Sequence, residues 1–194
     1  MSNSKDAIDR LFKLQTKINM MVMDGTREAK NVADILQQIL EERQTYLRHV
    51  ETSTLAPTKG DVTLAEANNV FSWLDGDFKN WGTDVPSEDT VKAEVDVYEM
   101  ECDRNYGTLF GLLGDPRKLC LTQGQIVEFC RSHRDSLRQE GYGTFFLFKV
   151  KDVLFVANVS VVGGRLEANV YRFDDDAVWH AGSRHRLVVQ QQTI

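Results

Sequence analysis

The side chains with the greatest capacity for chemistry lie in a polar cluster near the C-terminal end of the sequence. An acidic run at 174–176 is followed closely by tryptophan, histidine and arginine. Carboxylates beside histidines can serve in general acid–base catalysis or bind a divalent cation. The candidate catalytic residues are Asp174, Asp176, His180 and His185, and Trp179 and Arg184 are candidate binding residues. Aspartates also favour turns, and because the cluster falls between strands, the sequence favours a solvated turn over a catalytic site.

A second candidate site is the aromatic-rich segment 71–82, which contains four aromatic residues and two glycines. Trp73 and Trp81 can line a binding cleft, with Asp75 and Asp77 as its polar groups. A calcium loop is not expected, because the position that needs a bidentate glutamate is occupied by Pro86. The alternative is a structural role, in which the aromatic side chains anchor a loop to the sheet.

The cysteines and histidines form no recognisable metal or nucleophile motif. Cys130 and His133 are three residues apart on a predicted helix, and Cys120 precedes them. The chain has neither a C-x-x-C nor an H-x₃-H pattern, and Asp135 falls on the wrong helical face to orient His133. We expect a buried cysteine packed beside a histidine. Walker and dinucleotide-binding motifs are also absent, so the sequence predicts no metal and no cofactor.

The net charge of −6 is unevenly distributed along the chain. Residues 1–50 hold eight basic and seven acidic side chains, residues 51–117 hold five and fourteen, and residues 118–194 hold ten and eight. No segment is basic enough to predict nucleic-acid binding. No apolar run approaches the length of a membrane span, and the N-terminus lacks the apolar region of a signal peptide, so no membrane association is expected. Three cysteines, an odd and sparse set, favour the cytoplasm.

The best-defined structural pattern lies between 141 and 189. Aromatic and β-branched runs at 144–150, 153–162 and 166–171 predict strands, with turns at Lys151-Asp152 and Gly163-Gly164. Alternation of apolar and polar residues in the third run indicates an antiparallel meander with one buried face. Outside this region, the pattern predicts a strand at 93–100 and helices at about 64–74, 103–112 and 123–139.

The first fifty residues predict two amphipathic helices, at 4–24 and about 27–48, with Gly25 ending the first. The short connection favours a helical hairpin, which buries too little surface to be stable alone. We therefore expect it to bind a protein partner or to self-associate. The predicted fold class is α+β, with a helical hairpin at 1–50, a Pro- and Gly-containing linker at 51–61, and an antiparallel sheet domain with packed helices at 62–194.

Several runs along the chain resemble a recurring set of uncharacterised bacterial proteins: KLQTKINMMVMDGTREAKNVADILQQIL, FSWLDGDFKNWGTDVP, KLCLTQGQIVEF, EGYGTFFLF and YRFDDDAVWHAGSRHRLVV. The resemblance implies a modular build, with a shared N-terminal helical hairpin and varied C-terminal domains, and carries no activity. From the residues themselves we predict a non-enzymatic binding or interaction module that uses the aromatic-rich loop. The alternative is a small cytoplasmic enzyme built on the Asp/His cluster.

Overall fold

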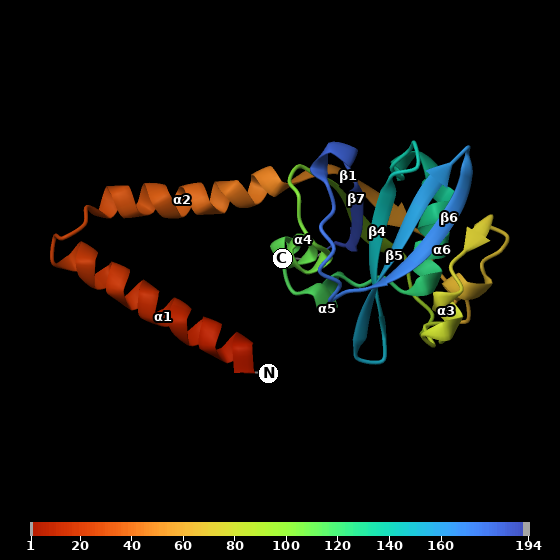
Figure 1. Cartoon of the computed structure of the whole chain (residues 1–194), viewed down its shortest axis with the longest axis horizontal. Coiled ribbons are helices and arrows are strands. Elements are labelled where there is room, and N and C mark those ends of the chain that lie inside the picture. The colour runs from red at the N-terminus through yellow and green to blue at the C-terminus, as the bar shows by residue number, and fades with distance from the viewer. Residues whose placement is uncertain (1, 192–194) are drawn as a thin grey trace. The chain divides into compact units, whose positions relative to one another are not determined.

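The computed structural model describes the backbone of residues 2–191 and the side chains of residues 10–37 and 46–191 (Figure 1). The chain forms two compact units, Met1–Gln44 and Thr45–Ile194. Among the described residues, no helix combines the length and apolar character needed to cross a membrane.

The N-terminal unit consists of helix α1, Ser2–Met23, and most of helix α2, Ala29–Tyr46. Gly25 adopts a positive φ of 74°, and the amide of Arg27 donates to the carbonyl of Met21, so the chain turns directly after α1. Both helices were predicted, but packing along their length as a hairpin is not confirmed. Among the described side chains of these two helices before Tyr46, the half-buried ones are Ile18, Met21, Val22 and Val32, and all others are exposed. Ile8, Ile39 and Leu40, which were predicted to share the apolar faces, have side chains outside the described residues.

The C-terminal unit is built on a seven-stranded sheet of the order β1-β3-β7-β4-β5-β6-β2. The strands are β1 (Leu47–Leu55), β2 (Trp73–Leu74), β3 (Ala93–Met100), β4 (Gly143–Val150), β5 (Val153–Val162), β6 (Arg165–Arg172) and β7 (Arg186–Gln190). The prediction of a purely antiparallel sheet is wrong, because β4 pairs with β7, and β6 with β2, in parallel. β7 does not continue the meander because the connection 173–185 carries the chain across β4 before it enters the sheet. The fold is therefore mixed α+β.

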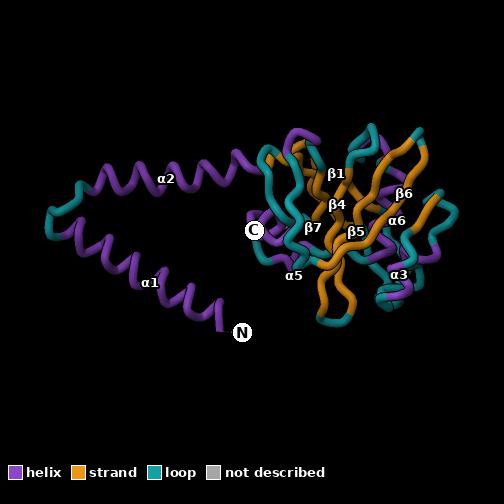
Figure 2. Tube along the Cα trace, in the orientation of Figure 1, coloured by secondary structure: helices purple, strands orange, loops and turns teal. Residues whose placement is uncertain are grey.

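The two predicted hairpin turns are confirmed. Gly163 and Gly164 both take positive φ angles, of 56° and 74°, which glycine adopts without steric cost. Lys151 takes a φ of 55° in the two-residue turn between β4 and β5. That hairpin extends beyond the neighbouring strands, as Figure 2 shows.

Helices cover both faces of the sheet. They are α3 (Asp77–Asn80), α4 (Tyr106–Leu113), α5 (Pro116–Leu119) and α6 (Gln123–Ser132), with short 3₁₀ turns η1 (Leu64–Glu66), η2 (Arg134–Ser136) and η3 (Ala181–Ser183). Phe129 of α6 and Phe78 of α3 belong to the core of one face, which we call the α6 face. Phe110 of α4 and Leu119 of α5 belong to a second core, on the opposite face. α6 begins at a capping box, in which Thr122 and Gln125 satisfy each other's backbone amides.

Two predicted helices are shorter in the structure. The segment predicted as a helix at 64–74 is helical only at η1 and ends in strand β2, because the amides of Ser72 and Asp75 donate to carbonyls of β6 and so join the sheet. The helix predicted at 123–139 ends at Ser132, where His133 leaves helical geometry with a φ of −123°.

The boundary between the units also differs from the predicted one. The first unit ends at Gln44, and the residues predicted as helix end and linker form β1 instead. β1 pairs with β3 from Leu47 to Leu55, with an irregularity between His49 and Glu51. Both Leu47 and Leu55 are buried, which anchors the strand at its two ends. Threonines in this segment suit a strand as well as a linker, so composition alone was ambiguous.

Candidate binding face of the sheet

The candidate site lies on the face of β4, β5 and β6 that is opposite α6. Cross-strand partners project to the same side of a sheet, so the register defines which side chains are neighbours. Gly143, Ser160, Glu167 and Trp73 form one row across β4, β5, β6 and β2. Phe145, Asn158 and Asn169 form the adjacent row. The side chains on this face that we call the polar face are Trp73, Asp75, Asn158, Ser160, Glu167, Asn169 and Tyr171.

One end of the polar face is closed by an aromatic cluster of Tyr106, Phe145, Tyr171, Trp179 and His185. The ring centroids of Trp179 lie 4.8 Å from Phe145 and 5.4 Å from Tyr106. Tyr171 meets the ring of Trp179 edge-on at 5.7 Å. Trp179 is held in place by backbone hydrogen bonds with Arg104 in both directions. The cluster therefore joins α4, strands β4 and β6, and the 173–185 connection at one point.

Three buried polar atoms of this region have no hydrogen-bond partner. They are the hydroxyl Oη of Tyr106, the amide oxygen Oδ1 of Asn158 and the indole Nε1 of Trp179. Across the described residues only five buried side-chain atoms lack a partner, and the other two lie singly, on Thr63 and Arg186. Because an unsatisfied buried polar atom costs about 1–3 kcal/mol, three of them in one region call for a partner from outside the chain, either water or a ligand.

Asn158 is placed by its neighbours on the adjacent strands. Its side chain gives a hydrogen bond to the hydroxyl of Tyr171, and burial raises the pKa of that tyrosine. A β-carbon at Gly143 would overlap the amide oxygen of Asn158, so glycine is needed there for close approach. Strand β5 thus positions the unpartnered amide oxygen of Asn158 against the backbone of β4.

His185 is a buried hydrogen-bonding group at the edge of the cluster. It is 6% exposed, and its ring stacks on Phe145 at 5.0 Å. The amide of Gly143 lies 3.0 Å from Nδ1 and donates to it when that nitrogen is unprotonated; when Nδ1 carries a proton, it can donate instead to the carbonyl of Gly143, 3.3 Å away. Burial lowers the pKa of His185 from its ordinary value. The histidine therefore contributes hydrogen bonding and shape here.

The structure separates the residues predicted in the aromatic-rich segment. Trp73 lies on the polar face by its register with Glu167, and Asp75 is close enough to affect the pKa of Tyr171. Trp81 lies on the α6 face, where it stacks on Phe155 at 6.4 Å and lies 5.1 Å beneath the Arg172 guanidinium. The two tryptophans therefore do not line one site. Asp77 accepts a hydrogen bond from Asn80 within α3.

The polar cluster near the C-terminal end is also divided. Asp174 and Asp176 are exposed, whereas His180 pairs with Asp103 at 3.2 Å and His185 is buried in the aromatic cluster. The amide of Ala181 and His180 together lower the pKa of Asp103. Within the described residues, no three His, Cys, Asp or Glu side chains are placed to hold a metal ion. The enzyme alternative, which needs these four candidate residues in one site, gains no support from their positions.

The remaining binding candidate, Arg184, lies at a cluster of charges beside β1 and β3. Its guanidinium is 4.0 Å from the buried carboxylate of Glu99, which Arg48 approaches more closely, at 2.7 Å. These residues line a cavity of about 370 Å³. Because Glu99 is already paired with Arg48, the charges here satisfy one another.

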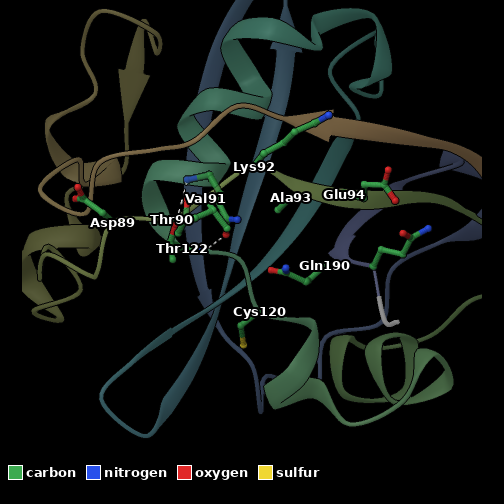
Figure 3. Close-up of a pocket in the computed structure, with 11 residues that line it drawn as sticks. Asp89, Thr90, Val91, Lys92, Ala93, Glu94, Cys120, Thr122 and Gln190 are labelled. Atoms are coloured by element: carbon green, nitrogen blue, oxygen red, sulfur yellow. Dashed lines mark hydrogen bonds between the residues drawn. The ribbon is translucent and has the colours of Figure 1, made fainter. Parts of the chain in front are cut away.

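A larger cavity of about 590 Å³ opens where β3 begins and β7 ends, and Figure 3 shows its lining, with Thr90, Thr122 and Gln190 around it and Cys120 at one side. Two of its polar groups already form hydrogen bonds within the fold: the hydroxyl of Thr90 bonds that of Thr58 at 2.7 Å, and Thr122 is the N-cap of α6. Burial raises the pKa of the Cys120 thiol to about 11, which disfavours the nucleophilic thiolate. None of the five buried unpartnered atoms found among the described residues belongs to this lining.

Cys130 and His133, tested from the sequence as a metal or nucleophile pair, have structural roles. Cys130 is fully buried, which raises the pKa of its thiol, and the His133 ring packs at 5.2 Å from Phe129. Sequence reasoning missed Asn158, Tyr106, Tyr171 and Gly143. A polar Asn158 inside an otherwise apolar strand was an available signal, whereas nothing in the sequence linked Tyr106 to the 173–185 connection.

Comparison with known proteins gives no relative from which a function can be transferred: no protein family, no curated protein and no solved structure matches this chain. The resemblance to a set of bacterial proteins therefore stays a prediction.

Proposed function

We propose that this protein is a non-enzymatic binding module whose ligand contacts the polar face between Trp73 and the aromatic cluster. The observation that carries the proposal is the gathering of three buried, unpartnered polar atoms, on Tyr106, Asn158 and Trp179, at one end of this face. A ligand that reaches this end can supply the missing hydrogen bonds or displace the waters that supply them.

The other end of the face offers an accessible aromatic surface. Trp73 is 49% exposed on the edge strand β2, whereas the neighbouring Phe71 and Phe78 are buried and anchor the segment. Glu167 and Asn169 are half-buried beside it on β6. An exposed indole next to partly buried polar groups is typical of binding surfaces, because the ring gives contact area at low entropic cost.

The side-chain chemistry of the polar face favours a neutral ligand rich in hydroxyl groups, such as a saccharide. Asp75 and Glu167 accept hydrogen bonds, while Ser160 and Asn169 both donate and accept, so each hydroxyl of a ligand can find a partner. The indole of Trp73 suits the apolar face of a sugar ring. The two carboxylates disfavour an anionic ligand. We place the module in the cytoplasm because Cys102, Cys120 and Cys130 are all free.

The three tryptophans provide an internal test by NMR. Their indole N–H resonances, assigned with single Trp-to-Phe variants, are followed on the full chain as cellobiose or maltose is added, with inorganic phosphate as the anionic probe. We expect the Trp73 resonance to shift most, Trp179 to shift as well, and Trp81 on the other face to stay fixed. Shifts at Trp81 alone, shifts with phosphate only, or none at millimolar sugar would overturn the proposal.

A variant pair separates binding from folding. Trp73→Ala should abolish the sugar-dependent shift at Trp179, whereas Trp81→Ala should preserve it. Both residues are exposed tryptophans from one segment, so the pair is matched in size and chemistry.

A further inference from the structure

Most of the described apolar side chains of the N-terminal unit are exposed. Leu11 and Phe12 of α1 are 65% and 64% exposed, and Ile35 and Leu36 of α2 are 56% and 48% exposed. The half-buried apolar residues of the pair, Ile18, Met21, Val22 and Val32, lie near the turn that joins the helices. Among the described side chains of the unit, contact between α1 and α2 is therefore concentrated at that turn, and the described apolar residues beyond it have no partner within the unit.

Burial of these faces requires more than two helices. Helices of 22 and 18 residues are marginal in water, since most helical stability in proteins comes from packing an amphipathic face. Two such pairs supply four helices, which is enough to enclose an apolar core. We propose that the N-terminal unit binds a second copy of itself, so that two chains form a four-helix assembly through their α1 and α2 faces.

The charges favour a second copy over a different partner. α1 contains four basic and two acidic residues, a net charge of +2, whereas α2 contains two basic and three acidic residues, a net charge of −1. α1 of one chain can therefore lie against α2 of the other with attraction between opposite charges. Residues 1–44 carry seven basic and seven acidic side chains, so two copies of the unit meet without net repulsion.

Helix length supports the same arrangement. At about 1.5 Å per residue, α1 and α2 extend about 33 Å and 27 Å. Their similar lengths allow each helix to pack along the whole of its counterpart. A membrane surface is a less suitable occupant, because amphipathic helices that bind anionic lipids carry an excess of Lys and Arg, whereas this unit is neutral.

Light scattering after size exclusion tests the proposal on the full chain over a range of concentrations. We expect a mass of twice 22.1 kDa for the wild type. The double variant Phe12→Glu/Ile35→Glu, which places charges in both apolar faces, should fall to 22.1 kDa. The control Lys17→Gln/Lys30→Gln changes the net charge by the same two units, at exposed polar positions, and should keep the wild-type mass.

Each possible result of this experiment either supports or overturns the proposed self-association. A monomeric wild type at the highest concentration overturns the proposal, and sedimentation of that monomer with phosphatidylserine vesicles would identify a membrane surface as the occupant. A dimer that survives the glutamate substitutions overturns this interface as the site of association. Loss of helical circular dichroism in the glutamate variant, together with loss of the dimer, supports the proposal, because the helices then depend on the second copy. The indole NMR resonances of Trp73, Trp81 and Trp179 should remain unchanged and confirm that the C-terminal unit is folded.

Discussion

The two faces of the sheet differ in how their buried polar groups are arranged: among the described residues, the two unpartnered atoms on the α6 side belong to separate elements, at Thr63 before η1 and Arg186 in β7, whereas the three on the opposite face gather at one end. On the α6 face, the side chain of Gln123 is buried and fully used: it accepts from the amide of Leu64 and donates to the carbonyls of Thr83 and Val85. On the opposite face, Tyr106, Asn158 and Trp179 each bury a polar atom that has no partner.

This difference separates structural polarity from polarity that is available to a ligand. Gln123 ties η1, the loop after α3 and α6 together, so its hydrogen bonds serve the fold. The orphan atoms of the other face serve no contact within the described chain, and retaining them costs stability. The polar groups available to a ligand therefore lie on the face opposite α6.

The largest effect is expected in the core of the α6 face. Phe146 is fully buried and meets Phe129 edge-on at 5.5 Å. Phe146→Ala should lower the free energy of unfolding by about 3–5 kcal/mol, because it removes buried area and leaves a cavity. Trp73→Ala on the polar face should cost about 1 kcal/mol or less, since its ring is half exposed. Urea denaturation measures both, and equal losses would mean that Trp73 is structural.

A second pair compares a satisfied polar group with an orphan. Gln123→Leu leaves an amide and two carbonyls buried without partners, so we expect a loss of about 3 kcal/mol in the free energy of unfolding. Tyr106→Phe removes a hydroxyl that has no partner in the chain and should change that energy by at most about 1 kcal/mol. A large loss in Tyr106→Phe would show that a tightly held water, rather than a vacancy for a ligand, satisfies this hydroxyl.

The sequence allowed the strands and turns of the C-terminal unit to be predicted because their signals are local. Alternation in 166–171 and the pair Gly163-Gly164 depend only on neighbouring residues. The parallel pairing of β7 with β4 could not be predicted, since it depends on how the 173–185 connection crosses the sheet. The residues of β1 were assigned to a helix end and a linker because their pairing with β3 joins residues 38 to 53 positions apart.

The candidate site was predictable only in part, for the same reason. Trp73, Asp75, Trp179 and His185 were each selected from the sequence, but for two different sites. Their common face is set by the register of β2 on β6 and by the packing of Trp179 on Phe145, which are long-range features. Composition can identify residues capable of binding, while the sheet decides which of them meet.

A third prediction concerns the glycine beneath the polar face. Gly143→Ala should lower the free energy of unfolding by about 1–3 kcal/mol, because the added methyl group overlaps Asn158 Oδ1 and the ring of Phe145. The double variant Gly143→Ala/Asn158→Ala should recover part of the loss by relieving the first overlap. If the double variant is no more stable than Gly143→Ala, then Asn158 is not what the glycine accommodates. Gly164→Ala, in an exposed turn with a positive φ, serves as a control for backbone strain alone.

The smallest expected effect is a pH dependence of stability that comes from His185 in the aromatic cluster. Burial lowers the pKa of His185 in the folded chain below the ordinary value of 6.5. As the pH falls below that value, the unfolded chain takes up a proton that the folded chain resists, so stability decreases; above it, this contribution to stability is constant. Protonation would also replace the bond that Nδ1 accepts from the Gly143 amide with one that Nδ1 donates to the Gly143 carbonyl. In His185→Asn the amide oxygen can accept the same bond without titrating, so the melting temperature of this variant should fall less between pH 7.5 and pH 5.5 than that of the wild type. Parallel curves of melting temperature against pH for the two proteins would contradict this prediction. They would show that His185 titrates normally and that water reaches the aromatic cluster.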